Sequence, residues 1–267
     1  MQRTRRTPTI AIVFMAVLAI ITSGCAKPFD EDEAQKELLI YCGMTMIEPI
    51  REIADLMEKE NDCVIKIIKG GSGELYRCLK ANQLGDLFLP GAESYIAACA
   101  DEGLIAATAP VGYNQAALMV PKGNPGKITG DLICLTDERH RVVLANPETG
   151  SIGRETAAIL KKRGIYDAAY QNAIFLTVDS KDLVKALREG SADLTINWRA
   201  TTCRQENRSI MEAVAIKADY ATPERLVLGL LSCSAYPEIA RQFMDYCTSP
   251  AGRKIFKKHG FLNGVQP

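Results

Sequence analysis

Histidine is almost absent from this chain of 267 residues, which holds only His140 and His259. The two lie far apart and without ligand spacing, so they give little support to a zinc site and leave little general-base capacity. No Ser-His-Asp or His-Cys grouping is recognisable, and the segment 71–73 lacks the flanking pattern of a hydrolase nucleophile turn. We therefore expect no enzyme activity, no metal ion and no cofactor.

An excess of charge of either sign is also lacking, because 32 basic residues are balanced by 32 acidic ones. Such a chain offers no broad basic surface to attract nucleic acid, so we expect no nucleic-acid partner. The glycine-rich segment 70–73 is not followed by Gly-Lys-Ser/Thr, which excludes the phosphate loop of nucleotide enzymes.

Long apolar runs are confined to the amino terminus, where arginines precede the unbroken apolar segment 10–21. This segment is too short for a stable membrane span and has the order of a secretory signal. It leads into Thr22-Ser23-Gly24-Cys25, which resembles the lipobox of bacterial lipoproteins. We expect a lipoprotein signal peptide over 1–25, lipid attachment at Cys25, and an exported protein anchored to the bacterial membrane, facing the periplasm or cell exterior. A plain signal peptide with a chance cysteine is the alternative.

The segment 26–36 is polar and acidic, and it reads as a solvated tether because nothing in it can bury a core. The remaining body is long enough for two modest domains. No second apolar stretch in the sequence reaches transmembrane length.

Cysteine is abundant, with eight residues besides Cys25. An even number in an exported protein permits disulfides. However, none forms a CxxC pair, and most fall at apolar positions of expected strands and helices, where free thiols behave as small hydrophobes. We favour thiols, with disulfides left open.

The body alternates short apolar strands with segments of helical periodicity. Strands are expected at 38–42, 63–68, 86–89, 142–145, 173–177, 193–197 and 226–231. Helices are expected at 47–57, 74–82, 93–102, 152–162, 181–189, 237–247 and 251–258. This order predicts an α/β protein with parallel sheets and helices on both faces.

Three loops that follow expected strands are rich in glycine and hydroxyl residues: 42–45, 70–73 and 146–153. Ligands of parallel sheets bind at these strand ends, where helix N-termini present free N–H groups to anions. Simple capping by Thr45, Ser72 and Ser151 is the alternative for any one loop. Three such loops in register favour an anion site. Trp198 also follows a strand, and either covers the core or faces the ligand.

The segments 70–75, 85–91, 145–153, 249–252 and 255–261 together resemble the molybdate- and tungstate-binding proteins of ABC importers. The resemblance covers nearly all of 38–261. It implies the type II periplasmic-binding-protein fold, with two lobes, each a mostly parallel sheet flanked by helices, and two crossing hinge strands. Lobe 1 is then 37–114 with 229–267, and lobe 2 is 115–228.

The resemblance also implies a site for a tetrahedral oxyanion in the cleft between the lobes. Thr45 and Ser72 match hydroxyl ligands, Ile152 and Ser180 stand where backbone N–H groups reach the anion, and Trp198 replaces a tyrosine donor. Asn197 is an alternative donor. With the loop residues added, the candidate binding residues are Thr45, Ser72, Ile152, Ser180, Trp198, Gly43, Gly73 and Ser151.

The function implied is capture of molybdate or tungstate by a monomer that docks on an ABC permease in the membrane. Met44 and Trp198 depart from the family pattern, which leaves the oxyanion open. A receptor for another small anion or organic acid, and a ligand sensor for a signalling partner, are the alternatives.

Overall fold

The computed structural model describes residues 35–264. The expected signal peptide, Cys25 and nearly all of the expected tether therefore lie outside the described residues. The first strand, β1 (Lys36–Gly43), already begins at Lys36. Within 35–264, no helix combines the length and apolarity that crossing a membrane requires.

The first sheet has five strands in the order β2-β1-β3-β10-β4. Its members are β1, β2 (Cys63–Gly70), β3 (Leu87–Leu89), β4 (Ile105–Asn114) and β10 (Glu224–Leu231). β1 pairs in parallel with β2 and β3, as the βαβ order of the sequence predicts, whereas β10 is antiparallel to both β3 and β4.

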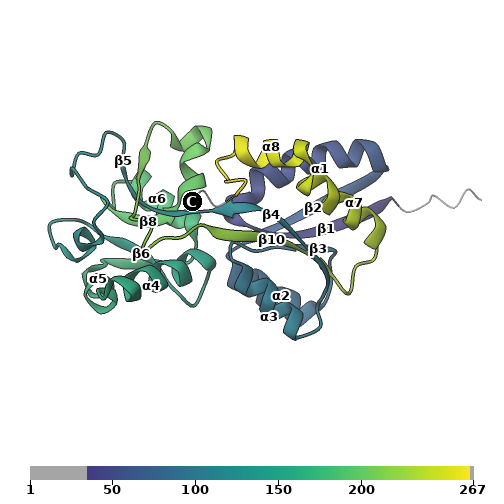
Figure 1. Cartoon of the computed structure of the whole chain (residues 1–267), viewed down its shortest axis with the longest axis horizontal. Helices are drawn as coiled ribbons and strands as arrows, with labels where there is room; N and C mark the ends of the chain where they lie inside the picture. The colour runs from purple at the N-terminus through teal and green to yellow at the C-terminus, as the bar shows by residue number, and fades with distance from the viewer. Residues whose placement is uncertain (1–34, 265–267) are drawn as a thin grey trace, which may run out of the picture. The chain divides into compact units, whose positions relative to one another are not determined.

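Helices cover both faces of this sheet (Figure 1). One face carries α1 (Ile47–Asn61), α7 (Pro237–Thr248) and α8 (Pro250–Lys258), and the other carries α2 (Ser72–Asn82) and α3 (Glu93–Asp101). The two-residue period of a strand explains how β1 serves both layers. Leu38, Ile40 and Cys42 join the core beneath α1, α7 and α8, while Tyr41 packs with α2 and α3.

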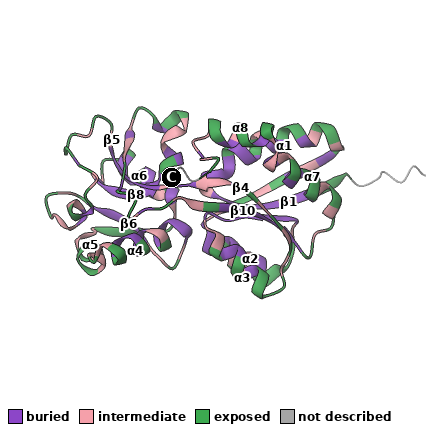
Figure 2. Cartoon of the chain, viewed as in Figure 1, coloured by how far each residue is buried: buried purple, intermediate pink, exposed green. Residues whose placement is uncertain are grey.

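The other half of the body holds a three-stranded sheet and a two-stranded sheet. β5 (Ala116–Pro121) is antiparallel to both β8 (Thr195–Trp198) and β9 (Met211–Val214), and β6 (Val143–Ala145) is parallel to β7 (Phe175–Thr177). A parallel bridge between Val142 and Leu194 joins the two parts. The helices here are α4 (Ser151–Arg163), α5 (Tyr166–Asn172) and α6 (Ser180–Arg188). Buried residues follow the strands and the inward helix faces (Figure 2).

Two strands, β4 and β10, connect the halves as the expected crossing pair. They pair with each other along most of their length; β4 passes directly into β5, and the chain returns from β9 into β10. The short helix η3 (Arg199–Cys203) adds a packing contact between the halves. Its residue Ala200 is buried in the core beneath α1, α7 and α8. The boundaries expected for the two lobes remain a prediction.

Candidate functional site

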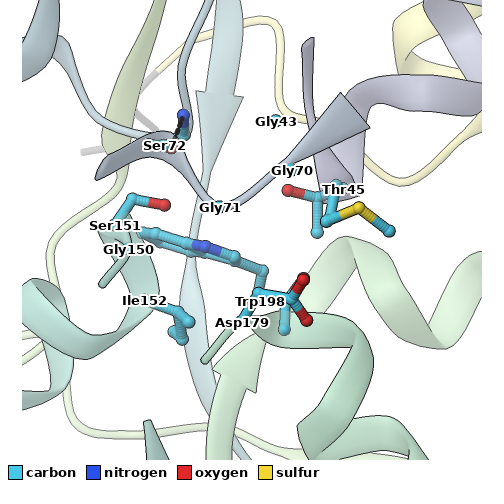
Figure 3. A pocket seen from close by; sticks show the side chains of 13 residues that line it. Gly43, Thr45, Gly70, Gly71, Ser72, Gly150, Ser151, Ile152, Asp179 and Trp198 are labelled. Atoms are coloured by element: carbon cyan, nitrogen blue, oxygen red, sulfur yellow. Dashed lines mark hydrogen bonds between the residues drawn. The ribbon is translucent and has the colours of Figure 1, made fainter. Parts of the chain in front are cut away.

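Four helix starts meet at one pocket. Its lining comes from the starts of the short helix η1 (Met44–Met46), α2, α4 and α6, together with Gly91 after β3 and Trp198 at the end of β8 (Figure 3). Each helix start presents backbone N–H groups without intrahelical partners. Strands of the five-stranded sheet lead into η1 and α2, and β6 and β7 lead into α4 and α6, so the pocket lies at the carboxyl ends of strands in both halves.

Three of these helix starts are capped by glycine: Gly43, Gly71 and Gly150 have extended backbones and make no side-chain capping hydrogen bond. Ser72 and Ser151 are the first residues inside their helices, and Thr45 lies within η1. The alternative in which these three residues act as caps is therefore wrong. Because glycine supplies no capping oxygen, the N–H groups of these helix starts stay available to a ligand.

Ser72 is buried, and its Oγ accepts the backbone N–H of Gly91 at 2.9 Å. A hydroxyl whose oxygen accepts one bond keeps its proton to donate. A side chain at Gly91 would collide with Ser151 Oγ. Glycine at 91 therefore lets the serines of the two halves approach the same point.

The remaining hydroxyl of the first half belongs to Thr45, which is also buried. Its Oγ1 donates to the thioether sulfur of Met46 at 3.1 Å. Thioether sulfur is a weak acceptor. An anion in the pocket would be the better acceptor, so turning this hydroxyl toward a ligand gives up only the weak hydrogen bond to Met46.

In the second half, Ile152 and Ser180 bring the starts of α4 and α6 to the pocket, and both are buried. Asn197 does not line the pocket and is fully buried. Its Nδ2 donates to the Ser180 carbonyl at 2.9 Å, and its Oδ1 accepts the Trp198 N–H at 2.8 Å. Asn197 as a ligand donor is therefore wrong, because its amide is used to position the two residues that do line the pocket.

Trp198 is both a core residue and a lining residue, since it is only 1% exposed. Figure 3 shows its indole extending across the pocket toward Ser151, with no hydrogen bond drawn to the other lining residues. The ring limits the space in the pocket and supplies one N–H donor.

The lining contains no lysine or arginine, and Asp179 is its single charged residue. Asp179 caps α6: its Oδ1 accepts the N–H groups of Lys181 at 2.8 Å and Asp182 at 3.1 Å. Burial raises the pKa of the Asp179 carboxyl. Positive potential in the pocket therefore comes from helix starts and hydrogen-bond donors rather than from cationic side chains. Within 35–264, no group of three or more His, Cys, Asp or Glu is arranged to hold a metal ion.

The pocket is small, with about 20 Å³ open to the centre of a water-sized sphere. A single water molecule needs roughly 10–15 Å³ of such space. The two halves also touch beside it: a Cβ at Gly71 would lie 3.1 Å, and one at Gly73 2.7 Å, from the Thr149 carbonyl oxygen. The space is therefore on the order of one or two water molecules.

Comparison with known proteins decides the family. The family described as bacterial extracellular solute-binding protein matches residues 38–262. The chain belongs to this family. Family and fold are those of solute-binding proteins rather than enzymes.

Three relatives illustrate its range. The Bacillus subtilis protein YvgL, named as an ABC transporter substrate-binding lipoprotein, is 25% identical over 93% of this chain and 96% of its own. The molybdate-binding protein ModA of Rhodobacter capsulatus is 20% identical over 92% and 95%. The sulfate-binding protein SubI of Mycobacterium tuberculosis superposes with a TM-score of 0.74 at 13% identity, covering 85% of this chain and 86% of that one.

Most of the residues predicted from the sequence of this family member meet at the pocket. Gly73 does not line the pocket. It follows Ser72 in α2 and lies against Thr149. The candidate residues omitted four lining residues that lie within the three expected loops, Met44, Gly70, Gly71 and Gly150, and two that lie outside them, Gly91 and Asp179. Gly91 lies in the segment 85–91 that carried the resemblance, and Asp179 lies two residues before the expected helix 181–189, so both had a local signal. The predicted residues that do line the pocket are Gly43, Thr45, Ser72, Ser151, Ile152, Ser180 and Trp198.

Proposed function

We propose that this family member is the solute-binding lipoprotein of an ABC importer and captures a tetrahedral oxyanion, molybdate or tungstate, in the pocket. The observation that carries the proposal is the convergence of glycine-capped helix starts on a pocket of about 20 Å³ without lysine or arginine. Such a pocket offers donors for acceptor oxygens, and its small volume favours a compact anion.

The chemistry of the donors fits a fully ionised oxyanion. Hydroxyls of Thr45 and Ser72 and backbone N–H groups at Ile152 and Ser180 are donors that need no proton exchange with the ligand. A dianion such as molybdate accepts at every oxygen. Because sulfate has the same shape and charge but shorter bonds, selection between them depends on how far apart the donors stand.

The resemblance and the relatives support the finer parts of the proposal. ModA of Rhodobacter capsulatus is named for molybdate, whereas SubI is named for sulfate, which makes sulfate the competitor to test. Export, lipid attachment at Cys25, a monomeric state and docking on a membrane permease complete the proposal. The name of YvgL as a lipoprotein supports the anchor.

Calorimetric titration of residues 36–267 with molybdate, tungstate, sulfate and phosphate tests the ligand. We expect one-to-one binding of molybdate and tungstate, with sulfate and phosphate at least a hundredfold weaker. Equal affinity for sulfate would contradict the selectivity. Absence of measurable binding for all four anions would contradict the oxyanion function itself.

The anchor has a separate test. In cells that express the full chain, the protein should fractionate with membranes, and Cys25→Ser should abolish incorporation of labelled fatty acid. Unchanged labelling of the variant would contradict lipid attachment at Cys25.

A further inference from the structure

A second and larger cavity adjoins the pocket, and Met44 and Ser180 line both. It lies between the first turns of α1, the end of β2, the exposed face of α6 and the loop 201–207. About 340 Å³ is open to the centre of a water-sized sphere. Met44 and Ser180 therefore stand between the pocket and a space large enough to hold a hydrated anion.

The charge of this cavity differs sharply from that of the pocket. Two acidic residues, Glu48 and Glu206, line it, against six basic ones. The basic residues are Arg51, Lys69, Lys181, Lys185, Arg188 and Arg204. The chain as a whole carries no net charge, so this excess of four positive charges is a local concentration.

The positive charges are largely uncompensated within 35–264. Of the six, Lys185 alone forms an ion pair, with Glu189 at 3.9 Å. Arg188 donates to Asn207 Oδ1 at 3.0 Å, and Arg204 donates to the Met44 carbonyl at 2.6 Å. Both acceptors are neutral, so these bonds orient the guanidinium groups without cancelling their charge.

The cavity draws its charges from both halves of the protein. Arg51 and Lys69 belong to the first sheet and its helices, whereas Lys181 belongs to α6. The bond from Arg204 to Met44 spans the two halves at the boundary between cavity and pocket. At another edge of the pocket, Gly71 already lies against Thr149. The cavity is therefore the charged side of the cleft.

Like charges gathered around one cleft repel each other, and low-dielectric walls focus their field into it. Such a field raises the local concentration of anions and their association rate by about 10- to 1,000-fold. The pocket lacks cationic side chains, so its attraction for anions comes from helix starts alone and falls off within a short distance.

We propose that this basic cavity is an outer anion-binding site, which collects the oxyanion from solvent and delivers it to the pocket. The inference rests on the proposed oxyanion function of the pocket. The two cavities then have separate roles. The basic cavity sets the association rate, while the uncharged donors of the pocket set the dissociation rate and the selectivity.

The test compares two triple variants with the same change in charge. Arg51→Gln/Lys69→Gln/Lys181→Gln removes three exposed charges from the cavity that make no ion pair or side-chain hydrogen bond within 35–264. Arg241→Gln/Lys254→Gln/Lys257→Gln removes one arginine and two lysines, also exposed and unpaired in that range, from α7 and α8. Neither set includes a residue that lines the pocket.

Stopped-flow fluorescence on the purified full chain measures both rates, because Trp198 is the single tryptophan and lines the pocket. At low ionic strength, we expect the cavity variant to bind molybdate or tungstate at least tenfold more slowly than the control variant. Dissociation should change less than threefold, and the difference should vanish at high salt. Equal association rates in the two variants, with tight binding retained, overturn the inference alone. Absence of oxyanion binding by the unmodified protein overturns the proposed function, and the inference with it.

Discussion

The backbone N–H of Gly91 donates to Ser72 Oγ, and the two atoms lie 2.9 Å apart. This bond ties the loop after β3 to the first residue of α2, which leaves the serine proton free to point into the pocket. A side chain at Gly91 would meet Ser151 of the other half. Gly91 thus holds Ser72 through a hydrogen bond and leaves room for Ser151 of the other half.

Ser72→Ala should weaken oxyanion binding about 10- to 100-fold, because a hydrogen bond to a charged group contributes roughly 1.5–3 kcal/mol. It also leaves the Gly91 N–H without its acceptor. Calorimetry with molybdate measures the effect. Ser232→Ala is the matched control, because Ser232 is exposed and donates to the Gly103 carbonyl away from the pocket. Affinity within twofold of the unmodified protein in both variants would remove Ser72 from the site.

Gly73→Ala should prevent the two halves from meeting, since the new Cβ would lie 2.7 Å from the Thr149 carbonyl oxygen. Overpacking of this kind costs about 1–3 kcal/mol, which appears here as weaker ligand binding rather than as unfolding. Gly71→Ala, at 3.1 Å from the same atom, should have a smaller effect. The opposite order of affinities, or a large fall in melting temperature for Gly73→Ala alone, would contradict closure through this contact.

Glu155 on α4 makes the stability of the protein depend on pH. Burial, with a further contribution from Glu224, raises the pKa of its carboxyl from 4.5 to about 7. Below pH 4.5 the carboxyl is protonated in both the folded and the unfolded chain. Between pH 4.5 and 7 the folded chain keeps a proton that the unfolded chain releases, so the free energy of unfolding falls as pH rises through this window.

Urea denaturation at pH 5 and pH 7.5 measures this fall. Glu155→Gln should reduce the loss of stability between the two values, because its amide does not titrate. Glu60→Gln, at an exposed position of α1, serves as the control and should retain the loss. The same pH dependence in all three proteins would assign the effect to other groups.

The cysteines should react with thiol reagents in an order set by burial. Cys233 is exposed, whereas Cys42, Cys99 and Cys247 are buried, and burial raises the pKa of the Cys99 thiol to about 11. A high pKa and burial both suppress the reactive thiolate. With a disulfide exchange reagent at pH 8, Cys233 should react first and Cys233→Ser should remove the fast phase.

Unfolding of residues 36–267 should then release all eight thiols, since each of these cysteines is unpaired in the structure. A count below eight that rises on addition of reductant would show a disulfide instead.

Elements with strong local periodicity were predicted well from the sequence. The short apolar run of β1 and the helical spacing in α1 identify the type of both elements. The helix expected at 93–102 is α3, and Gly103, with φ +72°, follows its end. β4 was missed because most of its residues are small or polar. Its first six positions alternate between half-buried and exposed, without a buried apolar face. Its pairing with β10, more than a hundred residues away, holds it in the sheet, and no local pattern encodes that partner.

The sequence of this protein determined the residue types of the site: glycines and hydroxyls at the ends of strands, which predict an anion site without a cation. The tertiary structure decided which of them meet. It brought Ser72 and Ser151 close to Gly91, used the Asn197 amide to hold Trp198, and set a basic cavity beside a pocket without lysine or arginine. Local propensity acts over a few residues, whereas these arrangements depend on packing between segments far apart in the chain, which only the folded protein brings together.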